Sequence, residues 1–164
     1  MSLEAFAARL AAGDRSVVRD LLSSDTDLNR AFSIGRTPLM IAANGGFSDI
    51  VVSLIAAGAL VDACGTSGTT ALHDAAVNGH RRVVLTLLGS GTNVDSETDD
   101  GVTPLMCAAA WGQVSVAHVL IACGADVHHR ARRGDTALDI ASEKGEDEMV
   151  AFLESAAAFQ NRIA

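Results

Sequence analysis

The sequence predicts an all-α repeat solenoid, in which short helix–loop–helix units stack side by side. The main observation is a segment that recurs at Gly35, Gly68, Gly101 and Gly134. Each copy starts 33 residues after the one before (68 − 35, 101 − 68 and 134 − 101). A second observation is that 49% of the residues are hydrophobic but only 4% aromatic, which suits thin layers of close-packed helices. A fixed period of this length indicates a stacked array of one supersecondary unit.

The first helix of each unit is predicted from a threonine followed by apolar residues. In the second unit, Thr37 can cap free backbone amides, and Pro38 is tolerated in the first turn because its missing N–H would have no partner there. The apolar run from Leu39 to Ala43 is expected to be buried, and the small alanines let neighbouring units approach closely. Gly45-Gly46 is expected to end this helix.

The second helix is predicted from apolar residues at helical spacing. It is expected to begin near Ser48 and to end at Gly58, with the glycine in a left-handed conformation. Its inner face and the equivalent faces of the next two units are Ile50, Val51, Leu54, Ile55; Val83, Val84, Leu87, Leu88; and Val116, Ala117, Leu120, Ile121.

These units divide the chain into one domain over residues 1–164. We predict an N-terminal capping unit (1–34), three full units (35–67, 68–100 and 101–133) and a C-terminal capping unit (134–164). The first unit lacks the Thr-Pro-Leu segment, and residues 23–27 are expected to form a loop. Its expected apolar face is Phe6, Leu10, Val17, Val18, Leu21 and Leu22. The last unit carries Glu154 where the others have an aliphatic residue, which fits an end with nothing stacked beyond it.

Composition and motifs argue against several classes of function. The net charge of −8 disfavours nucleic acid as a partner. The cysteines are few and odd in number, three in all, which argues against a disulfide framework. We therefore expect a reducing compartment, the cytoplasm, with the nucleus as the alternative. We see no signal peptide and no membrane-spanning stretch, so we expect no membrane contact. Phosphate-binding loops and nucleophile elbows are also absent, so we expect no enzyme and no cofactor.

The units resemble the ankyrin repeat. They share its 33-residue period, the opening seen in Thr103-Pro104-Leu105, the paired alanines, the Val-Val-x-x-Leu-Leu helix and a closing motif such as Gly124-Ala125-Asp126-Val127. The departures are Ala71 and Ala137 in place of the proline, and Met40, Met106 and Asp139 in place of the usual histidine. The resemblance implies units joined by protruding β-hairpin turns. It also implies a non-enzymatic protein that binds other proteins through its concave side, formed by hairpin tips and first helices.

The repeat phase places the residues that would then touch a partner. We predict a protein-binding surface made of Trp111, Val77, Asn78, Val102, Glu97, Asp99, Asp100, Arg130, Arg132, Arg133, Arg36 and Asn44. Ser33 and Ile34 fall at the tip before the first full unit. Trp111 is the only tryptophan, and truncating a tryptophan hot spot can cost ~2–4 kcal/mol of binding. The alternative is that Trp111 folds down over its neighbouring unit and only shields backbone.

Charged tips suggest a second feature of this surface. Glu97, Asp99 and Asp100 form an acidic tip, and Arg130, Arg132 and Arg133 form a basic tip in the next unit. One interpretation is a bipolar site that steers and orients a partner of matched charge. The other is mutual neutralisation between tips, since exposed ion pairs contribute only ~0–1 kcal/mol.

The remaining polar and sulfur residues carry weaker predictions. His118, Cys123 and His128 occupy different positions of one unit, so we expect no metal site. We expect His73, in the family's usual histidine position, to hydrogen-bond between hairpins, Cys107 to be buried and Cys64 to be an exposed thiol. By resemblance, Asn29 is a candidate for hydroxylation by an oxygenase.

The predicted function is therefore non-catalytic protein binding by a monomer. The alternatives are a stoichiometric inhibitor of one enzyme or transcription factor, and a fragment of a larger protein whose catalytic domain lies elsewhere. Glu154 argues against dimerisation through the stacked ends.

Overall fold

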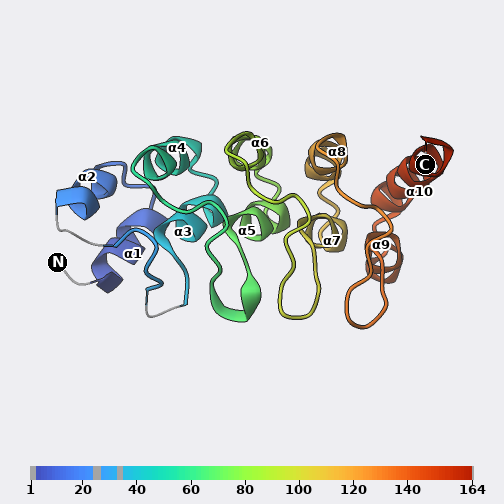
Figure 1. Ribbon diagram of the computed structural model, residues 1–164, viewed down its shortest axis with the longest axis horizontal. Coiled ribbons are helices and arrows are strands. Elements are labelled where there is room, and N and C mark those ends of the chain that lie inside the picture. The colour runs from blue at the N-terminus through green and yellow to red at the C-terminus, as the bar shows by residue number, and fades with distance from the viewer. Residues whose placement is uncertain (1–2, 24–26, 33–34, 164) are drawn as a thin grey trace.

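A computed structural model describes residues 3–23, 27–32 and 35–163 (Figure 1). In these parts of the chain, the helices stack in two layers, one of first helices and one of second helices, and the long loops protrude on one side (Figure 1). The helices are α1 (Leu3–Ala11), α2 (Ser16–Ser23), α3 (Pro38–Asn44), α4 (Ser48–Ala56), α5 (Ala71–Val77), α6 (Arg81–Gly89), α7 (Pro104–Ala110), α8 (Val114–Ala122), α9 (Ala137–Lys144) and α10 (Asp147–Ile163). A short 3-10 helix, η1, spans Thr66–Gly68. This all-helical repeat architecture confirms the predicted fold class.

Each first helix of the four later units begins directly after the predicted threonine. The hydroxyls of Thr37, Thr103 and Thr136 accept hydrogen bonds from backbone N–H groups three residues later, at 3.3, 3.4 and 3.2 Å. The exception is Thr70, whose Oγ1 lies 2.9 Å from Nδ1 of His73. Polar groups therefore cap the start of these helices even where alanine has replaced the proline.

The core consists of small and branched side chains between the two layers. First helices pack on first helices (α3 on α5, α5 on α7, α7 on α9) and second helices on second helices. Ala75, Ala76, Ala108 and Ala109 are fully buried, which allows this close approach. Leu22 corrects the prediction for the first unit, because it lies at the edge of the apolar face and is 53% exposed. Glu154 is exposed, as expected for the last unit.

Glycine is required where a first helix turns into a second helix. Gly46 has φ of +73°, a left-handed conformation that side chains rarely adopt. A Cβ at Gly46 would also lie 2.7 Å from the His80 ring of the next unit. The glycine thus lets the neighbouring unit pack directly against the turn.

The protruding tips are hairpin-like turns, and the described residues contain no β-strand. Two backbone bonds close each turn, for example Thr98 N to Val102 O at 3.0 Å and Gly101 N to Thr98 O at 2.8 Å. A further bond joins each later tip to the tip before it, as from Asp99 N to Ser67 O at 2.9 Å and from Arg132 N to Asp100 O at 2.9 Å. Since each turn has so few cross-bonds, the expected β-hairpins have no ladder. Ser33, Ile34 and residues 24–26 of the predicted loop lie outside the described residues.

A row of side-chain oxygens joins successive units away from the tips. Asn29 Oδ1 accepts a hydrogen bond from Leu60 N at 2.7 Å. Asp62 and Asp95, at the same repeat position, accept from Asn93 N and Asp126 N at 3.3 and 3.2 Å. The hydrogen bonds therefore tie each unit to the next one over most of the stack.

None of the described helices is both long enough and apolar enough to cross a lipid bilayer.

Candidate protein-binding surface

The residues predicted to bind a partner lie at the tips and at the carboxyl ends of the first helices. We call this the recognition surface: Arg36, Asn44, Val77, Asn78, Glu97, Asp99, Asp100, Val102, Trp111, Arg130, Arg132 and Arg133. Repeat geometry brings equivalent positions of neighbouring units side by side, because α3, α5, α7 and α9 pack in one layer.

Trp111 follows the last residue of α7 and projects from the surface. Its backbone N–H bonds to Ala108 O, and the residue is 64% exposed. A tryptophan folded over the neighbouring unit would have most of its ring covered. Trp111 is therefore available for contact, whereas Val77 and Val102 are half-buried beside the helices of the central units.

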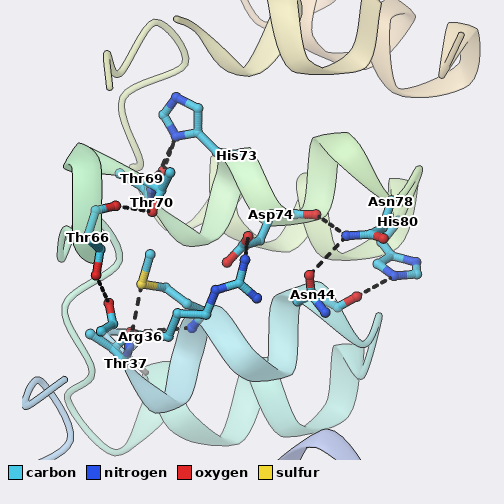
Figure 2. Close-up of polar contacts among 12 residues, drawn as sticks. Arg36, Thr37, Asn44, Thr66, Thr69, Thr70, His73, Asp74, Asn78 and His80 are labelled. Carbon is cyan, nitrogen blue, oxygen red and sulfur yellow. Dashed lines mark hydrogen bonds and ion pairs between the residues drawn. The ribbon is translucent and has the colours of Figure 1, made fainter. Parts of the chain in front are cut away.

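Asn44 and Asn78 form one network across two units (Figure 2). The Asn78 side-chain amide donates to Asn44 Oδ1 at 3.2 Å and to its own helix at Asp74 O, at 2.8 Å. His80 Nε2 lies 2.9 Å from Asn44 O. These bonds hold the two exposed amides in fixed positions, which reduces the side-chain entropy that a partner would have to overcome on binding.

Arg36 extends from the turn before α3 to Asp74 on α5 (Figure 2). Its Nη2 lies 2.7 Å from Asp74 Oδ1, while the arginine side chain is 36% exposed and the aspartate side chain 8% exposed. The second carboxylate oxygen, Oδ2, is buried without a hydrogen-bond partner. Burial raises the pKa of Asp74 to about 6, although Arg36 opposes that rise.

Asp74, which pairs with Arg36 of the preceding unit, was not predicted from the sequence. The available signal was its repeat position, which is occupied by Ile41, Cys107 and Ile140 in the other units. An acid at an apolar position requires a partner of opposite charge, and Arg36 is the nearby cation.

His73 links two units, as predicted. Its Nδ1 pairs with the Thr70 hydroxyl, and its Nε2 lies 3.0 Å from Val102 O in the next tip. Burial lowers the pKa of His73. The histidine therefore positions Val102 and the acidic tip relative to α5.

The two charged tips point outward without neutralising each other directly. Glu97, Asp99, Asp100, Arg130, Arg132 and Arg133 are all exposed. Within the described residues, no ion pair joins the acidic set to the arginine set. Glu97 instead lies 3.7 Å from His129, and Arg130 donates to Gly134 O at 2.6 Å. Most of the charge on both tips thus remains available to a partner.

The sulfur and histidine residues form no metal-binding cluster in the described chain. Cys64 and Cys123 are exposed, so Cys64 is placed as predicted. Cys107 is half-buried, which corrects the expectation that it is buried. Its surroundings still raise the pKa of its thiol to about 12, first through burial and second through the charge of Asp74. Asn29 is half-buried, and its hydroxylation stays a prediction.

Comparison with known protein families gave one match. A family model of ankyrin repeats, in three copies, matches residues 5–98 and 86–163. Comparison with curated proteins gave no match.

Proposed function

Because the chain belongs to the ankyrin repeat family, we propose that it is a non-catalytic protein that binds a partner through its recognition surface. Ankyrin repeats are generally protein–protein interaction modules. We further propose that it acts as a monomer in the cytoplasm, without cofactor, and contacts neither nucleic acid nor membrane. The net charge of −8 supports the exclusion of nucleic acid.

The exposure of Trp111 is the observation that carries this proposal. A large aromatic side chain that is 64% exposed leaves apolar area in water unless a partner covers it. Tryptophan is enriched at binding hot spots, where an anchoring side chain is surrounded by weaker contacts that exclude water. The fixed amides of Asn44 and Asn78 and the half-buried Val102 supply such surroundings along the same row of units.

The charged tips give the proposed partner an orientation. A partner with a basic patch opposite Glu97 and Asp100 and an acidic patch opposite Arg132 would be steered into one register. We therefore expect salt to slow association more than it speeds dissociation.

Affinity capture with the wild type and Trp111→Ala tests this function. We expect the variant to lose a partner that the wild type retains, because removing the indole removes the largest exposed apolar group of the surface. Phe159→Ala is the matched control, since Phe159 is also 64% exposed but lies on α10. Circular dichroism must show that all three proteins are equally helical.

The captured proteins also separate this proposal from its alternative. A single tight globular partner would favour a stoichiometric inhibitor, whereas several partners would favour an adaptor. If wild type and Trp111→Ala retain the same partners, the proposed centre of the surface is wrong.

A further inference from the structure

A basic cavity lies away from the tips, at the turns between first and second helices. It has a volume of about 470 Å³ and is lined by Arg15, Gly46, Ser48, Asp49, His80, Arg81, Arg82 and Val83. In each unit the tip leads into the start of the first helix, and this turn follows the end of that helix. The cavity is therefore at the opposite end of the helices from the charged tips, and Trp111 is not among its lining residues.

The cavity contains uncompensated positive charge. Arg15 forms an ion pair with Asp49, so these two lining residues neutralise each other. Arg81 and Arg82 are exposed, and neither has an ion-pair partner among the described residues. His80 is held in the wall by its contact with Asn44 O at 2.9 Å. Two guanidinium groups thus remain free to bind an anion.

The charges of the residues that line the cavity indicate which kind of anion it would bind. One carboxylate, that of Asp49, already lies in the cavity, and it is matched by one arginine. The remaining two positive charges match a phosphate monoester, which carries about −1.5 to −2 at neutral pH, better than a second carboxylate. Guanidinium groups also fit phosphate oxygens with paired, charge-assisted hydrogen bonds.

The protein as a whole argues against a nucleic acid in this cavity. The net charge is −8, so an extended polyanion would be repelled beyond the local basic group. The acidic first turn of α10, with Asp147 and Glu148, follows the same edge two units further along. A single phosphate requires only the two free arginines.

We propose that this cavity binds the phosphate group of a phosphorylated side chain on a protein partner. The site lies at the opposite end of the helices from the charged tips and adjoins Asn44 of the recognition surface through His80. It would make binding depend on phosphorylation of the partner. Arg81 and Arg82 would hold the phosphate, and His80, fixed against the preceding unit, would form the wall beside it.

The first test is a titration with inorganic phosphate, followed by NMR at the backbone amides of residues 46–50 and 80–84. We expect saturable shifts in the wild type and at least about tenfold weaker binding in the double variant Arg81→Ala/Arg82→Ala. The matched control is Arg19→Ala/Arg30→Ala, which removes two exposed arginines that belong neither to the cavity lining nor to the recognition surface and should bind phosphate like the wild type. Equal binding by both double variants would overturn the proposal.

The second test identifies the source of the phosphate. A phosphoserine peptide should shift the same amides and bind more tightly than its unphosphorylated form. An oligothymidylate that binds there more tightly than the phosphopeptide, or acetate that binds as well as phosphate, would contradict the proposal. Circular dichroism of each variant excludes loss of folding as the cause, and the outcome is independent of Trp111.

Discussion

Lowering the pH from 7 to 5 is expected to stabilise the wild type by about 1 kcal/mol relative to Asp74→Asn. The pKa of Asp74 is raised to about 6 in the folded protein, mainly by burial. The folded protein therefore takes up a proton more readily than the unfolded chain, so protonation below about pH 6 favours folding. Asp74→Asn keeps the shape of the side chain but cannot titrate. The measurement is urea unfolding of both proteins across this pH range.

Few other groups near Asp74 can contribute to the pH-dependent difference in stability between the wild type and Asp74→Asn. The elements packed against α5 are α3, α6 and α7. Arg36 faces Asp74 from the turn before α3, and Cys107 on α7 is a thiol whose pKa of about 12 keeps it neutral. Arg81 and Arg82 on α6 are exposed to solvent.

Lowering the pH has the opposite effect on stability through His73, so Asp74→Asn is needed as a reference protein. Because burial lowers the pKa of His73, the unfolded chain binds the proton more readily below about pH 6.5, and stability falls as the pH falls. This loss occurs in both proteins and cancels in their difference. A difference that does not change with pH would show that Asp74 is not buried as described.

Leu87→Ala is expected to lower the free energy of unfolding by about 3 kcal/mol, and Leu153→Ala by about 2 kcal/mol. Both leucines have the same repeat position and are almost fully buried, at 0% and 2% exposure. Leu87 lies on α6, which packs between α4 and α8, whereas α10 has a second helix on one side only. Since each unit contacts only its neighbours, the end unit can relax around the lost methyl groups more easily.

Urea unfolding of the two variants beside the wild type provides the measurement. The removed atoms are the same, so the transfer contribution is equal and the difference reports the packing around each site. If Leu153→Ala lowers the free energy of unfolding by as much as Leu87→Ala or by more, α10 is not packed on one side only.

The sequence was sufficient to predict most of the helices, because the same short motifs recur in the four later units. A threonine before an apolar run starts each later first helix, and a glycine such as Gly46 allows the turn that follows. The residues of the recognition surface could be placed by their repeat phase alone. Their exposure, as at Trp111, depends on contacts that the phase does not specify.

The features that the sequence did not reveal involve pairs that occur only once. Arg36 and Asp74 are 38 residues apart, and no other unit repeats this combination. A repeat pattern describes what the units share, so it does not predict a contact between two residues that each occur in one unit only. Leu22 was assigned wrongly for a related reason, since its position is only half-buried even in the inner units and is exposed in the first.

Hydrogen exchange of the protein alone and in complex with the captured partner tests directly whether the partner binds the recognition surface. We expect new protection at the tips, residues 64–69, 97–102 and 130–135, and around Trp111. The outer side of the second helices, marked by the exposed Val52 and Leu85, should exchange as before. Protection confined to α4, α6 and α8, with the tips unchanged, would show that the partner binds the opposite side and that the proposed recognition surface is wrong.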